Sequence, residues 1–87
     1  GLASLPTFEL PSADVAGEGA WIVKLLADAG LCASNGDARR LIKGGGAYVN
    51  EDRVEDMNLK LTAADFADGF VIVKAGKKKV KRIVLKD

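Results

Sequence analysis

"SNGDARRLIKGGGAYVN", residues 34–50, decides the fold, because it contains the start of a helix, the end of that helix and the entry into a strand. Ser34 followed by Asp37 resembles a capping box with aspartate in the acidic position, so a helix is predicted over 35–43. Gly44 ends that helix, since glycine readily takes the conformation that terminates helices. The glycine run is read as chain geometry, a helix end plus a close backbone crossing into a strand that begins with "AYVN".

The predicted helix has an apolar face and a basic face. At 100° per residue the apolar side chains gather on one side, namely Ala38, Leu41 and Ile42. The basic side chains gather roughly opposite, namely Arg39, Arg40 and Lys43. These side chains neutralise phosphates, and the planar fork of arginine grips two phosphate oxygens or stacks on an unpaired base. The basic face therefore suggests RNA binding, while a merely solvated helix side remains the alternative.

On the N-terminal side, a first helix is predicted from Ala20, because apolar residues recur there at helical spacing before Gly30. Residues 1–19 contain both prolines and no sustained period, so they are interpreted as a linker or N-terminal arm. The folded domain is expected to occupy 20–87.

On the C-terminal side, the predicted elements are short. They are a strand pair over 47–50 and 53–54 with its turn at Glu51 and Asp52, a strand at 59–61, a helical turn within 62–68, and a terminal β-hairpin of 70–73 with 83–85 around "KAGKKKVK". The predicted fold class is α+β, with two helices packed on a small mixed β-sheet.

The charge is unevenly distributed along the 87 residues, although the net charge is only +1. Residues 1–73 carry six basic and eleven acidic side chains, a balance of −5, whereas 74–87 carry seven basic and one acidic, a balance of +6. The hairpin cations become candidate RNA contacts: Lys74, Lys77, Lys78, Lys79, Lys81 and Arg82. A solvated hairpin tip that discourages edge-to-edge aggregation is the alternative interpretation.

Several functional classes lack support in the sequence. There is no histidine, Cys32 is the single cysteine, and no phosphate-binding or catalytic motif occurs. We therefore expect no catalytic residue, no metal site, no cofactor and no small-molecule substrate in this chain. The longest apolar run is far shorter than a membrane span, so we expect no membrane partner and a cytoplasmic location.

The succession "AGLCASNGDARRLIKGGGAYVNEDRVED", residues 29–56, resembles the RNA-binding domain, with its αL motif, named after the fourth protein of the small ribosomal subunit. The arm "LPTFELP" at 5–11 and the ending from 68 resemble, more closely, the C-terminal domains of bacterial tyrosyl-tRNA synthetases. With both ends included, the resemblance covers nearly the whole chain.

The resemblance implies a non-catalytic module that holds tyrosine tRNA by its long variable arm and adjoining stem. It also implies a parent synthetase that uses ATP and magnesium and dimerises through its catalytic domain. The positions that match the family's RNA-binding motif are Ser34, Arg39, Arg40, Lys43, Asn50 and Arg53, with the hairpin lysines matching more loosely.

One departure concerns the turn, which in the family usually reads Val-Asn-Gly. Here Asn50 is followed by Glu51 and Asp52, which weakens the expectation of an RNA contact at Asn50 and Arg53. Two other functions stay open: the same domain type in a ribosomal-RNA modifying or ribosome-associated protein, and a protein-interaction module that uses the hairpin edge.

Overall fold

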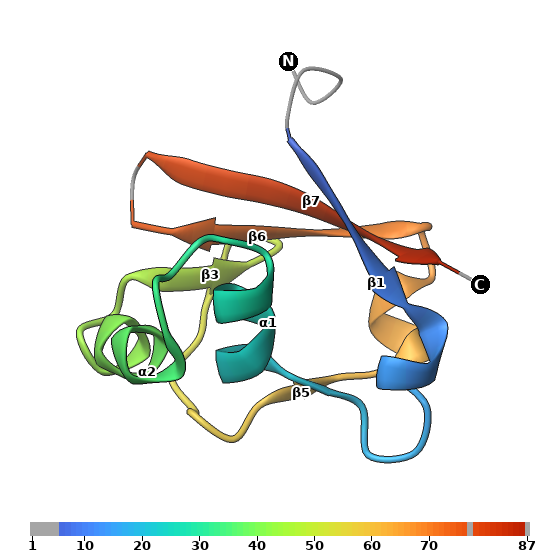
Figure 1. Ribbon diagram of the computed structural model, residues 1–87, viewed down its shortest axis with the longest axis horizontal. Coiled ribbons are helices and arrows are strands. Elements are labelled where there is room, and N and C mark those ends of the chain that lie inside the picture. The colour runs from blue at the N-terminus through green and yellow to red at the C-terminus, as the bar shows by residue number, and fades with distance from the viewer. Residues whose placement is uncertain (1–5, 77, 87) are drawn as a thin grey trace.

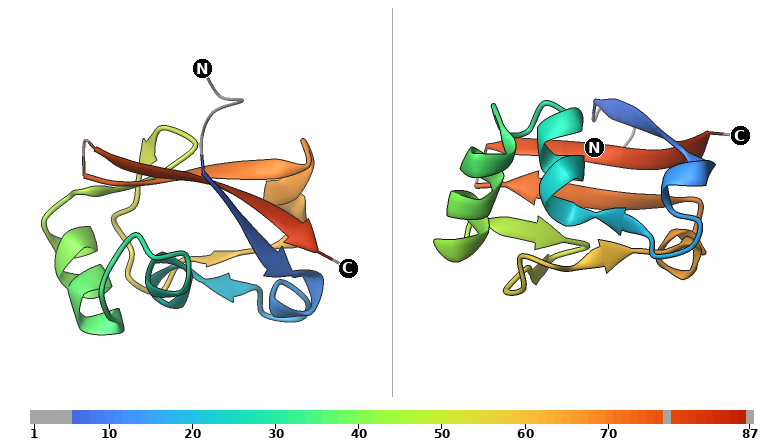
Figure 2. Two further views of the ribbon diagram at one scale, coloured as in Figure 1. Left: turned by 45° about the horizontal axis from the view of Figure 1, so that its top comes forward. Right: turned by 60° about the horizontal axis from the view of Figure 1, so that its bottom comes forward.

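The computed structural model describes residues 6–76 and 78–86, and in them two helices pack on one face of a mixed sheet (Figures 1 and 2). The helices are α1 (Ile22–Asp28) and α2 (Asn35–Lys43). The described sheet has the strand order β1 (Thr7–Pro11), β7 (Lys79–Lys86), β6 (Phe70–Ala75), β3 (Ala47–Val49) and β4 (Asp52–Arg53). The predicted α+β class, with two helices on a small mixed sheet, is confirmed.

The core lies between the helices and the sheet. Val71, Val73 and Ile83 face it from the two central strands and are fully buried. Ile22 and Leu26 meet them from α1 and are equally buried. This packing orients both helices, because each presents its apolar stripe to the sheet and leaves its polar side in solvent.

Smaller elements complete the chain. Strands β2 (Ala20–Trp21) and β5 (Lys60–Leu61) form a separate antiparallel pair, and β2 leads directly into α1. Two short 3-10 helices follow β1 and β5, namely η2 (Ser12–Asp14) and η3 (Ala63–Phe66). The predicted helical turn after Thr62 is therefore present, and a capping box between Thr62 and Asp65 starts it.

The N-terminal segment contributes a strand that sequence analysis does not predict. Strand β1 pairs in parallel with β7, with Thr7 opposite Arg82. The side chains of Leu10 and Val15 are buried in the core. The described part of the 1–19 segment is thus built into the same core as the rest of the chain.

Helix α2 begins and ends where the sequence predicts. The Oγ of Ser34 accepts the backbone N–H of Asp37 at 3.2 Å, and Gly45 follows the helix with a φ of +77°. Next to it, a Cβ on Gly46 would lie 2.6 Å from Cδ1 of Leu41. The backbone therefore crosses closely under α2 before it enters β3, as expected for the glycine run.

The tight turn lies one residue earlier than predicted. Val49 is opposite Asp52, so the turn residues are Asn50 and Glu51, with φ values of 50° and 75°. The prediction of a turn at Glu51 and Asp52 is wrong, because positive φ at both positions marks a type I′ turn, which favours asparagine first. The Asn50 side chain also accepts the N–H of Ile72 at 2.9 Å, which fixes this register.

The terminal hairpin is confirmed, but its tip is shorter than predicted. Ala75 is opposite Lys79, so the connection is 76–78 and not the whole of 74–81. Lys77 lies outside the described residues. Because the strands extend into the basic run, three of its lysines project from strands and not from one loop. Lys74 lies in β6, and Lys79 and Lys81 lie on one face of β7.

Candidate nucleic-acid interface

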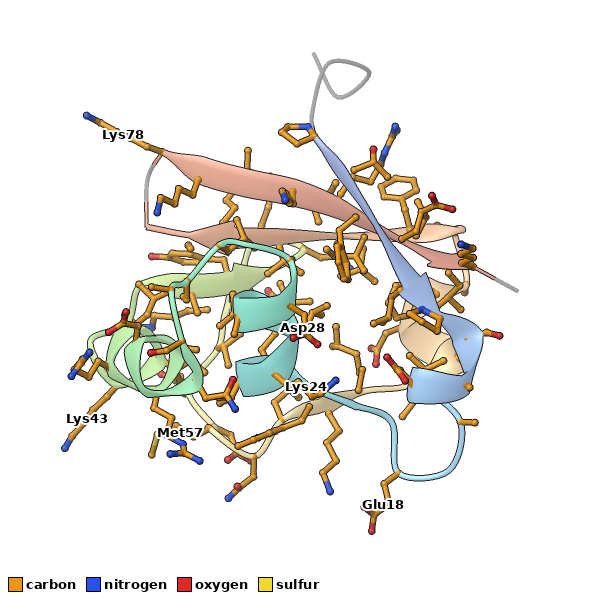
Figure 3. The ribbon with its side chains drawn as sticks, in the orientation of Figure 1. Glu18, Lys24, Asp28, Lys43, Met57 and Lys78 are labelled. Carbon is orange, nitrogen blue, oxygen red and sulfur yellow. The ribbon has the colours of Figure 1, made fainter. Side chains whose placement is uncertain are left out.

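The basic side chains of α2 form an exposed ridge at one end of the molecule. Arg39, Arg40 and Lys43 are all exposed. In Figure 3, Lys43 on α2 and Lys78 in the hairpin connection project from the same side of the molecule, whereas Glu18 lies away from them. Both basic clusters of the sequence therefore lie on the same side of the molecule.

A groove of about 790 Å³ joins these two clusters. Arg40 of α2 lines one wall, and Lys78 and Lys79 of the hairpin line the other. Its remaining lining is mainly apolar, from Leu31, Cys32, Ala33, Leu41 and Ala75. Cations on both walls of an open groove can hold a phosphate backbone that runs along it.

One carboxylate also lies in this groove. Asp37 lines it and forms an ion pair with Arg40, one helical turn along α2. The pair orients the guanidinium across the helix surface, while the Arg40 side chain stays 78% exposed. An exposed pair of this kind is weak, so Arg40 can exchange it for a phosphate.

Cys32 belongs to the apolar part of the groove and not to a reactive site. Burial raises the pKa of the Cys32 thiol, Asp37 adds to the rise, and Lys79 opposes it. A thiol with a raised pKa is protonated at neutral pH and is a poor nucleophile. The residue therefore packs as a small hydrophobe.

A second hollow, of about 430 Å³, lies on the other side of the C-terminal end of α2. Lys43 and Arg53 line it together with Met57. Arg53 also forms an ion pair with Glu55 at 3.2 Å between Nη2 and Oε1. The structure thus brings Arg53, from β4, beside the basic helix.

Other candidate residues have structural partners instead. The Lys81 ammonium donates to the backbone carbonyl of Ala29, directly after α1. Arg82 donates to the Thr7 hydroxyl at 3.3 Å, and its Nε is buried without a partner in the structure. Lys74 is opposite Tyr48. By the alternation of β6, Lys74 faces away from the core-facing Val73 and thus from the helices.

Ser34 and Asn50 also have structural roles. Ser34 caps α2, and Asn50 holds the β3–β4 turn against β6. Both side chains are exposed, but each is already engaged with backbone. Of the twelve candidates, those at the two hollows are therefore Arg40, Lys43, Arg53, Lys78 and Lys79.

One cluster that includes Arg39 of the ridge is not predicted from the sequence. The guanidinium carbon of Arg39 lies 5.4 Å from the ring centroid of Trp21, a cation–π contact between α2 and β2. The indole Nε1 donates to the carbonyl of Met57 at 2.7 Å. These contacts depend on how the helices pack, and the sequence carries no periodic signal for them.

Among the residues that the structure describes, no helix is long and apolar enough to cross a membrane. Over the same residues, no three histidine, cysteine or acidic side chains are grouped so that they could hold a metal ion.

Comparison with known proteins identifies related chains. Residues 5–83 match the family model described as the tyrosine-tRNA ligase SYY-like C-terminal domain. The tyrosine-tRNA ligase of Caulobacter vibrioides strain NA1000 is 49% identical over 78 residues, which are 90% of this chain and 18% of that protein. The tyrosine-tRNA ligase of Rhodopirellula baltica is 43% identical over 86 residues, 98% of this chain and 20% of that protein. The chain thus spans about a fifth of the length of these relatives.

Proposed function

Because this chain belongs to the tyrosine-tRNA ligase SYY-like C-terminal domain family, we propose that it is the tRNA-binding module of such a ligase. The observation that carries the proposal is the groove with Arg40 on one wall and Lys78 and Lys79 on the other. Cations from two elements converge there on one open groove, where they can neutralise the phosphates of one RNA strand.

The proposed ligand is the long variable arm of tyrosine tRNA with its adjoining stem. A-form RNA displays phosphates and 2′-hydroxyl groups along a shallow minor groove, so a protein recognises such a stem mainly by shape and backbone contacts. One strand would follow the groove past Arg40, and the ridge of α2 would lie against the stem. Lys43 and Arg53, at the second hollow, would extend the contact on the other side of the helix.

The module is proposed to bind and not to catalyse. The parent ligase would bind ATP and magnesium, and would dimerise, through its catalytic domain in the cytoplasm. The module would contribute affinity and orientation for the tRNA.

The test is a salt-dependent titration of the chain with tyrosine tRNA and with the same tRNA lacking its variable arm. The double variant Arg40→Glu/Lys79→Glu changes both walls of the groove. The matched control is Lys86→Glu, an exposed cation at the opposite end of β7. We expect the double variant to weaken binding at least about tenfold at low salt and to reduce the slope of log affinity against log salt by about two.

The control variant and the wild-type chain should bind alike, and removal of the variable arm should weaken wild-type binding. Equal losses from Lys86→Glu and from the double variant would contradict the groove as the site. A stronger preference for a ribosomal-RNA hairpin than for the tRNA would instead favour a ribosome-associated role for this domain.

A further inference from the structure

We propose that Trp21, Arg39 and Met57 form a platform on which an unpaired base of the bound RNA stacks. This inference rests on the proposed function and extends it, because it assigns base recognition to a cluster beside the phosphate-binding cations. We call this cluster the stacking platform.

Two contacts fix the indole of the stacking platform. Its Nε1 donates to the Met57 carbonyl at 2.7 Å, which restrains the ring in its plane. The Arg39 guanidinium lies over the ring at 5.4 Å from its centroid. Trp21 itself is anchored in the chain, since it pairs with Lys60 in the β2–β5 ladder and immediately precedes α1. The ring is therefore held before any ligand arrives.

The stacking platform is accessible to solvent. Trp21 is only half-buried and Arg39 is exposed. Met57 is 40% exposed, the most exposed large apolar side chain among the described residues. The guanidinium over the indole is a cationic surface, and Met57, whose backbone carbonyl accepts the indole N–H, adds exposed apolar area. Such surfaces bind the faces of nucleobases.

The position of the stacking platform favours an RNA ligand over a protein ligand. Met57 lines the hollow that Lys43 and Arg53 also line, so phosphate-binding cations stand directly beside it. Figure 3 shows Met57 and Lys43 near each other at the edge of α2. A strand whose phosphates contact these cations would bring its bases within reach. In a continuous stem the bases are stacked on each other, so only an unpaired base can enter.

The competing explanation is an internal clamp. In that case Trp21 would only orient Arg39 toward a phosphate, and no base would touch the ring. The two explanations differ in a measurable way, because a clamp has no preference for RNA that contains an unpaired base.

The sequence offers a direct probe, since Trp21 is the single tryptophan of the chain. The chain is titrated with two RNA hairpins of identical stem, one fully paired and one with a single bulged adenosine, and the tryptophan emission is followed. We expect the bulged hairpin to quench the emission strongly and to bind about fivefold or more tighter, as base–aromatic stacking provides. The fully paired hairpin should quench it little.

Variants separate stacking from folding. Trp21→Leu should lose the preference for the bulged hairpin while it keeps salt-dependent binding to the paired one. Trp21→Phe retains an aromatic ring and should keep part of the preference, with binding followed by fluorescence anisotropy of labelled RNA. If Trp21→Leu fails to fold, as judged by circular dichroism, the comparison of the two hairpins on the wild-type chain decides.

The outcomes for the stacking platform and for the groove are distinct. Equal affinity and equal quenching with the two hairpins, or a preference that survives in Trp21→Leu, would overturn the stacking platform and leave the salt-dependent groove in place. Absence of salt-dependent binding to either hairpin and to tyrosine tRNA would overturn both proposals.

Discussion

Glu51 has a backbone conformation that disfavours any side chain. Its φ is 75°, in the left-handed region, where a side chain costs about 1–2 kcal/mol. Asn50 before it has a φ of 50° and suits the first position of the type I′ turn, whereas the second position favours glycine. The turn therefore stores strain at one side chain.

Glu51→Gly is expected to stabilise the chain by about 1 kcal/mol, because relief of strain outweighs the added freedom of the unfolded chain. Urea denaturation followed by circular dichroism measures the change. Glu51→Ala is the matched control, since it removes the same charge and keeps a Cβ, and it should leave stability nearly unchanged. Equal stabilisation by both variants would assign the effect to charge.

Cys32 provides a pH-dependent test at the same scale. Burial raises its pKa in the folded chain, so folding favours the protonated thiol. Its stability contribution is thus fully present below the thiol pKa of the unfolded chain, and is lost as the pH rises through the folded pKa. Stability of the wild-type chain should fall more steeply over this alkaline range than that of Cys32→Ala. Parallel pH profiles of the two chains would refute this.

Among the elements, α1 shows how a candidate RNA contact serves the fold. Lys81 of β7 reaches across to the carbonyl of Ala29, where the backbone leaves the helix. A cation at a helix C-terminus satisfies unpaired carbonyls and interacts favourably with the helix dipole.

Lys81→Met is expected to destabilise the chain by about 1 kcal/mol and to change tRNA affinity less than about twofold. Lys79→Met, two residues earlier on the same strand, should weaken tRNA binding and leave stability nearly unchanged, since Lys79 lines the groove and is exposed. Thermal denaturation and RNA titration of both variants provide the comparison. If Lys81→Met is fully folded but binds tRNA much more weakly, Lys81 contacts the RNA after all.

Local signals explain which elements the sequence predicts well. The bounds of α2 follow from Ser34 and Gly44, because caps act within one turn of the chain. The predicted β3–β4 turn, at Glu51 and Asp52, is one residue too late. The observed turn, at Asn50 and Glu51, depends on positive φ at both positions and on a hydrogen bond from Ile72 in another strand.

Long-range pairing explains what the sequence does not reveal. The alternation of polar and apolar residues at 7–10 is only four residues long and lies between two prolines, and its partner β7 lies at the other end of the sequence. The Arg39–Trp21 contact likewise exists only after α1 and α2 have packed. For the site, the sequence supplied the two basic clusters, and the fold supplied the groove between them.

In the whole molecule, strand β1 forms one edge of the sheet and covers part of the core. Leu10 on β1 is 3% exposed, whereas its neighbour Glu9 is exposed on the opposite face of the strand. The two residues therefore test whether this segment belongs to the folded unit.

Leu10→Ala should cost about 2–4 kcal/mol of stability, as a cavity in the core does, and Glu9→Ala should change stability by less than about 0.5 kcal/mol. Urea denaturation gives both values. Similar small effects from the two substitutions would mean that 1–19 acts as a loosely attached arm.

The parallel pairing of β1 with β7 also bears on how fast the chain reaches its native state. Thr7 and Arg82 are 75 positions apart, so their contact closes nearly the whole chain into a loop. Contacts of such high sequence separation form slowly, because the entropy of loop closure is lost before the pairing compensates for it. The β6–β7 hairpin and the α1–α2 pair join nearer neighbours, so they are expected to be established first. Of the five strands in this sheet, the first to be synthesised is thus the last to dock.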